Sequence, residues 1–157
     1  MDVDTAVRKQ LANVLTWRDA HVGFDKAIEG IPVHARGKRP SGLPYSAWQL
    51  LEHMRIAQRD ILDFCRNPDY EELNWPDDYW PHAPEPPTAS AWDESVRQFR
   101  EDRAAMQKIA TETADLLAKI PHGSGQTYLR EVLLVADHNA YHVGELVLLR
   151  RLLGIWT

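Results

Sequence analysis

Proline and glycine are concentrated in three intervals of this sequence, and four long stretches are nearly free of both. The intervals are 30–44, 68–87 and 121–125, and six of the ten prolines lie in the second of them. Because proline lacks an amide donor and clashes with the preceding helical turn, no helix crosses that interval. The remaining segments, near 3–29, 46–66, 90–119 and 126–153, are each long enough for a helix of several turns.

Apolar residues recur along each segment at alternating steps of three and four, which is typical of a helix with one face turned towards partners. Ser46, followed three residues later by Gln49, predicts a capping box, and Ser90 precedes an acidic first turn. Strand-like alternation does not extend over any useful length. We therefore expect an all-α fold, a four-helix bundle that forms a single domain over residues 1–157.

The interval 68–87 is long for a connection within a bundle. About 20 extended residues reach roughly 60–70 Å, whereas a helix of about 20 residues spans about 30 Å. The connection is therefore long enough to return the chain to its starting end, so that the second and third helices would run parallel. Its aromatic rings need a surface to cover them, so we expect it to pack on the bundle. These rings are Tyr70, Trp75, Tyr79 and Trp80.

Composition sets several functional classes aside. The net charge of -5 argues against a nucleic-acid or anionic membrane partner, because both require a surplus of positive charge. The single cysteine, Cys65, forms neither an internal disulfide nor a thiolate metal cluster. No uncharged apolar run approaches the roughly 20 residues that span a bilayer, and the first residues do not resemble a signal peptide. We expect a cytoplasmic protein.

Three histidines lie on the apolar faces of the second and fourth predicted helices. His138 and His142 are four residues apart, so their side chains project from one face on successive turns and can reach one metal ion. His53 shares its face with Leu50 and Ala57. A third imidazole from this helix would complete a three-nitrogen site with open positions. Such a site lowers the pKa of a bound water or thiol, or polarises a carbonyl.

The same histidines also have a purely structural interpretation. A histidine on an apolar stripe is usually a core-edge residue with a hydrogen-bond partner, and two histidines four residues apart arise by chance. Burial of three imidazoles is costly unless each ring nitrogen is satisfied, and a shared cation would satisfy them together. On the residues alone, a metal site and a set of packed histidines both remain open.

Other chemistries have little support in the sequence. The zincin pattern requires Glu after its first histidine, but Asn139 follows His138. No Glu precedes a histidine by three residues, as di-iron bundles require, and no glycine-rich phosphate loop is present. No serine lies in a nucleophile elbow. Cys65 is expected to be a small core residue rather than a nucleophile.

Four further features each allow two interpretations. His21 is either a ligand or pocket wall, or a packed core residue, and we expect core packing. Asp137 points about 100° away from His138, so we expect it to take no part in a site. Glu145 either accepts a hydrogen bond from His142 or faces solvent, and we expect solvent. The run from Trp75 to Pro81 either covers the histidines or joins the second and third helices.

Two sequence motifs, one in the second predicted helix and one in the last, resemble those of a known protein family. Ser-x-Trp-Gln-Leu-x-x-His opens the second helix from Ser46 to His53, and His-x-x-x-His-x-Gly-Glu-Leu runs from His138 to Leu146 in the last one. With four helices and a long middle crossover, the chain resembles the DinB-like superfamily of metalloenzymes, which includes YfiT-type and mycothiol-dependent relatives. The resemblance covers nearly the whole chain.

The resemblance implies an up-down-down-up bundle that holds a divalent metal with His53, His138 and His142. Zinc or nickel are the foremost expectations, with iron, manganese and copper as alternatives. Characterised branches are thiol-dependent transferases or isomerases, which implies a small-molecule substrate and a low-molecular-weight thiol, and many members form homodimers. The function expected is thus a metal-dependent enzyme, a transferase or hydrolase with no assignable general base. The alternative is a non-catalytic bundle that binds a metal or a small ligand.

Overall fold

The computed structural model describes residues 2–156, and all regular secondary structure in that range is helical. No β-strand occurs between residues 2 and 156, so the expected all-α class is confirmed. Within the same range, none of the helices combines the length and apolar character that crossing a bilayer requires. The helices are α1 (Val3–Val14), α2 (Phe24–Ile28), the short 3-10 helix η1 (Val33–Ala35), α3 (Ala47–Arg66), α4 (Ala91–Glu112) and α5 (Tyr128–Leu152).

The four predicted helix starts are observed, and three of them carry side-chain caps, the first being Asp2, which accepts a hydrogen bond from the Thr5 amide at the start of α1. Ser46 and Gln49 form both arms of the capping box at the start of α3. Thr127 caps α5 by accepting a hydrogen bond from the Arg130 amide. Ser90 occupies the N-cap position of α4, but its side chain makes no capping hydrogen bond.

The expectation of one continuous helix over 3–29 is wrong. α1 ends at Val14, and α2 begins only at Phe24, after Gly23 in an extended conformation. The Thr16 hydroxyl donates to the Asn13 carbonyl, which competes with continuation of the helix. Leu15 and Phe24 pack in two different apolar clusters, and the interruption allows both to be buried.

The third helix is shorter than the segment 90–119. α4 ends at Glu112 because Thr113 adopts an extended conformation. The chain then turns so that Leu116 becomes buried and its carbonyl accepts a hydrogen bond from the Leu129 amide. Tertiary packing of the α4–α5 connection therefore overrides the local helical pattern.

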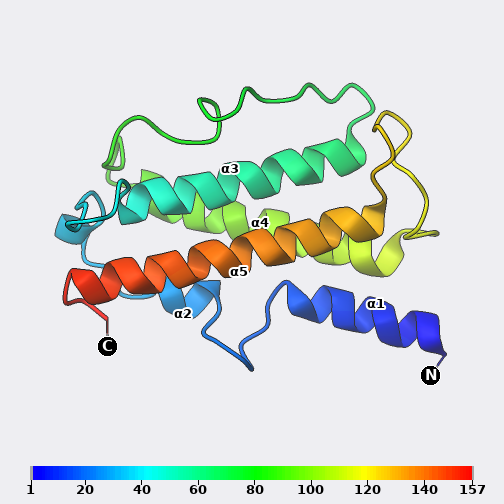
Figure 1. The fold of residues 1–157 in the computed structure, drawn as a ribbon, viewed down its shortest axis with the longest axis horizontal. Helices are drawn as coiled ribbons and strands as arrows, with labels where there is room; N and C mark the ends of the chain where they lie inside the picture. Colours follow the sequence, from blue (N-terminus) through cyan, green and yellow to red (C-terminus); the bar gives the residue numbers. More distant parts are fainter. Residues whose placement is uncertain (1, 157) are drawn as a thin grey trace.

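Figure 1 shows how the four long helices lie together. The crossover between α3 and α4 runs back along the bundle, so α3 and α4 point in the same direction, while α1 and α5 point the opposite way. α3 contacts both α4 and α5, and α1 contacts mainly α4. The crossover lies along α3 (Figure 1), and its Trp80 ring contacts His53 of that helix.

A polar layer divides the buried core into two apolar clusters. The cluster at the α2 end includes Phe24, Met54, Phe99 and Val143, and the cluster at the other end includes Leu11, Leu62, Met106 and Val135. Apart from Ala57, the buried side chains of α3 and α5 that belong to neither cluster include four polar ones, and each of these needs a partner. They are His53, Gln58, Asn139 and His142.

Candidate metal centre

The structure brings the three expected histidines together between α3 and α5. His53 Nε2 lies 3.1 Å from His142 Nε2 and 3.1 Å from His138 Nε2. His53 and His142 are buried, and His138 is partly exposed. One ring nitrogen from each histidine lies within 4.8 Å of those of the other two. The three rings therefore converge on one point at the polar layer.

Hydrogen bonds on the opposite side of two rings fix their tautomers. His53 Nδ1 lies 3.0 Å from the carbonyl oxygen of Tyr79, and His142 Nδ1 lies 2.6 Å from Oε2 of Glu145. Both partners are acceptors, so each Nδ1 carries the hydrogen and donates. Each Nε2 of His53 and His142 then presents a lone pair to the other at 3.1 Å. Two facing lone pairs repel, and a cation between them removes the repulsion.

The surroundings of the cluster favour the neutral form of two histidines. Burial lowers the pKa of His53 to about 4, with a further lowering contribution from His142. Burial likewise lowers the pKa of His138 to about 4, together with the neighbouring His142 and His53 rings, while the Asn139 side chain opposes this shift. Neutral imidazoles are the form that binds metal ions.

The crossover covers His53 directly. Trp80 stacks on the His53 ring at 3.8 Å between centroids and an interplanar angle of 5°. The hydroxyls of Tyr70 and Tyr79 both donate to Asp60 on α3, which ties the crossover down. Of the two interpretations of the run from Trp75 to Pro81, the contacts support the one in which it covers the histidines.

Glu145 is a correction to the sequence analysis, because it does not simply face solvent. Its side chain is 20% exposed and accepts from His142 through Oε2, while Oε1 accepts from the Tyr45 hydroxyl at 2.5 Å. Burial and the Glu145 carboxylate raise the pKa of Tyr45, so this hydroxyl remains a donor. The sequence analysis missed Tyr45 altogether. Only the spacing of Glu145, three residues after His142, signalled the contact beforehand.

The remaining candidates lie outside the cluster. His21 is exposed rather than packed in the core, and it lines a surface pocket. Asp137 is exposed, as its position on α5 predicted. Cys65 is buried in the apolar cluster at the far end of α3, as expected for a core residue. Burial also raises the pKa of its thiol to about 12, which suppresses the thiolate.

The arrangement fits a metal ion in donor type and distance. A tetrahedral ion with metal–nitrogen bonds of about 2.0–2.1 Å separates its ligand atoms by about 3.3–3.4 Å. The two separations that involve His53, each 3.1 Å, are close to that value, and the third pair lies within 4.8 Å. Metal-binding histidines usually donate their other ring hydrogen to a carboxylate or a carbonyl, and His142 and His53 do so here.

Fold and site together define a helical protein with three converging imidazoles that could hold a metal ion. The sequence model of the DinB superfamily matches residues 16–146, which is most of the chain. This chain therefore belongs to the DinB superfamily, as its two histidine motifs led us to expect. No curated protein and no solved structure matches it significantly.

Proposed function

We propose that this protein binds one divalent metal ion through the Nε2 atoms of His53, His138 and His142. The observation that carries the proposal is the convergence of three Nε2 atoms. In His53 and His142 an acceptor bonds the hydrogen on Nδ1, so the Nε2 atom is unprotonated and has a free lone pair. The ion would lie in a single-domain bundle of the up-down-down-up type. The helix directions in Figure 1 support that topology.

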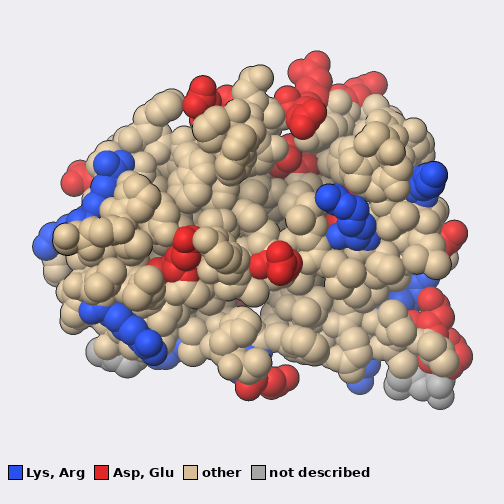
Figure 2. Space-filling view, in the orientation of Figure 1, with Lys and Arg blue, Asp and Glu red and all other residues tan. Residues whose placement is uncertain are grey.

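The donor set favours borderline metal ions. Three neutral imidazole nitrogens suit zinc and nickel, which we propose first, and iron, manganese or copper are alternatives. The crossover beside the site also favours cations. It contains six exposed acidic residues and no Lys or Arg between residues 68 and 87. In Figure 2 acidic side chains gather along the upper edge, where Figure 1 shows the crossover.

As an enzyme, the protein would act as a thiol-dependent transferase or isomerase. A divalent ion bound to three nitrogens lowers the pKa of a coordinated thiol or water and so supplies a nucleophile at neutral pH. Around it, Glu145 holds the Nδ1 hydrogen of His142, and Trp80 shields the His53 ring from solvent. The partly exposed His138 marks the more open side of the site. The substrates would be a low-molecular-weight thiol and a small electrophile.

A non-catalytic bundle that binds a metal or a small ligand is the alternative. It rests on the same histidine cluster. Because we assign no general base, the residues around the cluster favour neither version. The partners proposed for both versions are a small molecule and a second copy of the chain in a homodimer, and neither version includes nucleic acid or a membrane. The net charge of -5 supports a function without nucleic acid.

Metal analysis tests metal binding, which the enzyme and the non-catalytic bundle have in common. Protein purified without a nickel column should contain about one divalent ion per chain, and His138→Ala should lose it. His34→Ala is the matched control, because His34 is exposed on η1 and lies outside the cluster. If wild-type protein takes up none of zinc, nickel, iron, manganese and copper in stoichiometric amount when each is supplied, the proposal fails.

Activity separates the two versions once metal binding is established. Cysteine or another small thiol is incubated with a chlorinated aromatic or an epoxide acceptor, and wild type is compared with His142→Ala. In the transfer, the thiol proton leaves, a carbon–sulfur bond forms, and chloride departs or the epoxide opens. A rate that falls to background in His142→Ala supports the enzyme, and equal rates leave only metal binding.

A further inference from the structure

The side of α5 that faces solvent is apolar along most of its length. A surface helix usually presents charged and polar residues to water, but four large apolar side chains lie on this side, each between 47% and 66% exposed. At 100° per residue they fall on one face together with two exposed small residues. We call this face the α5 stripe, and it consists of Leu133, Ala140, Tyr141, Gly144, Leu148 and Leu152. In Figure 2 the surface in front of α5 carries few charged side chains.

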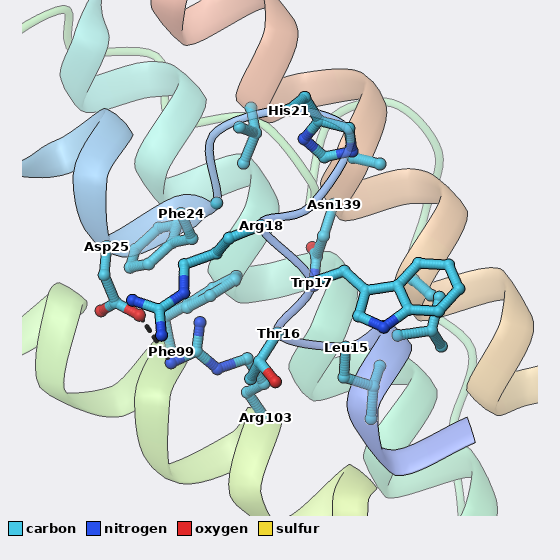
Figure 3. A pocket seen from close by; sticks show the side chains of 15 residues that line it. Leu15, Thr16, Trp17, Arg18, His21, Phe24, Asp25, Phe99, Arg103 and Asn139 are labelled. Carbon is cyan, nitrogen blue, oxygen red and sulfur yellow. Dashed lines mark hydrogen bonds and ion pairs between the residues drawn. The ribbon is translucent and has the colours of Figure 1, made fainter. Parts of the chain in front are cut away.

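Trp17 extends this apolar surface beyond α5. It lies in the connection between α1 and α2, and it lines one pocket together with Ala136 and Ala140 of α5. Its ring is 48% exposed, and in Figure 3 it lies on the opposite side of that pocket from Phe24 and Asp25. Single exposed apolar side chains are normal, but a continuous apolar surface marks an interaction site.

Gly144 lies in the middle of the α5 stripe, where its own fold gives no reason for a glycine. Glycine inside a helix lowers the stability of the helix relative to alanine. Gly144 does not have the positive φ that favours glycine. A Cβ atom at this position would meet nothing within 4 Å beyond its own helix in the part of the chain that the structure describes. A backbone from outside could approach α5 most closely at this point.

Two charged residues beside the stripe are arranged symmetrically about Gly144. Asp137 and Arg151 are each seven residues from it in opposite directions, which leaves both within about 20° of it around the helix. Both side chains are exposed, and neither forms an ion pair within residues 2–156. If two copies of α5 cross antiparallel at Gly144, Asp137 of each copy lies level with Arg151 of the other. The same symmetry places Leu148 level with the small Ala140, because each is four residues from Gly144.

We propose that the α5 stripe is the interface of a homodimer in which two copies of α5 cross antiparallel about a two-fold axis at Gly144. The inference rests on the second copy included in the proposed function and names the surface that this copy covers. A two-fold dimer uses the same patch on both copies, so the patch has to complement itself. The α5 stripe does so in charge, through Asp137 and Arg151, and in side-chain size, through Leu148 and Ala140. This self-complementarity favours a second copy over an unrelated protein.

Sedimentation equilibrium of the untagged full chain tests the interface. Wild type should be dimeric at about 50 μM, because specific interfaces reach micromolar Kd values or better. Gly144→Leu should be monomeric at the same concentration, because the new side chain occupies the crossing point. This variant should still fold, because the position is open within the chain and leucine favours a helix, and circular dichroism checks this.

The result separates failure of the interface from failure of the proposed function. A dimer that persists in Gly144→Leu overturns the α5 interface and leaves the homodimer in place. A monomeric wild type overturns the interface and the homodimer together, and would leave the α5 stripe to a different protein. Neither result bears on metal binding, which metal analysis measures separately.

Charge reversal tests the pairing across the two-fold axis. Asp137→Arg or Arg151→Asp alone sets like charges level at both ends of the interface, so the Kd of the dimer should rise about tenfold. The double variant reverses both members of each pair and should return the Kd to within about threefold of wild type. Asp93→Arg, exposed on α4, is the matched control for the net charge and should leave the Kd unchanged. The inference is overturned if the single reversals have no effect or if the double variant is not restored.

Discussion

Glu145→Gln should weaken metal binding without removing a metal ligand. The substitution keeps an oxygen acceptor next to His142 Nδ1 but removes the negative charge. In the native protein, the carboxylate accepts from His142 Nδ1 at 2.6 Å and from the Tyr45 hydroxyl at 2.5 Å. A carboxylate partner makes the imidazole a stronger donor to the ion and keeps its Nε2 lone pair aimed at the centre.

The expected magnitude follows from the burial of this pair. The side chains of His142 and Glu145 are 9% and 20% exposed, so solvent screens their hydrogen bond only partly. Charge-assisted bonds contribute about 1.5–3 kcal/mol, against about 0.5–1.5 kcal/mol for neutral ones. Mutation of the hydrogen-bond partner behind a ligating histidine typically weakens metal affinity about 10–100-fold. We therefore expect the Kd for zinc to rise about 10–100-fold, which is about 1.4–2.7 kcal/mol.

Competition with a chromophoric zinc chelator at pH 7.5 measures this change. Tyr45→Phe is the matched control, because it removes one hydrogen bond to Glu145 and keeps the carboxylate. Its effect should be a few-fold at most. A Kd in Glu145→Gln within twofold of wild type, with the helical circular dichroism unchanged, would refute the reasoning. The hydrogen bond to His142 would then have no influence on the metal site.

Two further predictions concern the core. Phe99 is fully buried and stacks on Phe24, so Phe99→Ala should lower the free energy of unfolding, measured by urea denaturation, by about 3–5 kcal/mol. The control Val7→Ala, on the exposed face of α1, should change it by less than about 0.5 kcal/mol. Burial raises the pKa of Cys65 to about 12, so a chromogenic disulfide at pH 8 should react with the thiol only after unfolding. Because that pKa lies above the unfolded value near 8.5, stability should fall relative to Cys65→Ala as the pH rises from about 9 towards 12.

Local sequence signals were reliable where neighbours along the chain decide the structure. Ser46 and Gln49 cap each other across one turn, so the start of α3 could be read directly from their spacing. The spacing of His138 and His142 places both rings on one face of any helix. The apolar periodicity of 3–29 failed, because it continues through a region in which Leu15 and Phe24 must enter different clusters.

The sequence by itself determined an all-helical chain and placed three histidines on inward-facing stripes, because helical periodicity and capping depend on residues within a few positions of one another. Only the tertiary structure decided what those histidines became. His53 receives its Nδ1 partner from Tyr79, 26 residues away, and meets His142 across 89 residues. Contacts over such separations depend on how the helices pack and how the crossover returns. The spacing of residues along one helix does not predict how the helices pack or where the crossover returns, because burial of the whole core determines both.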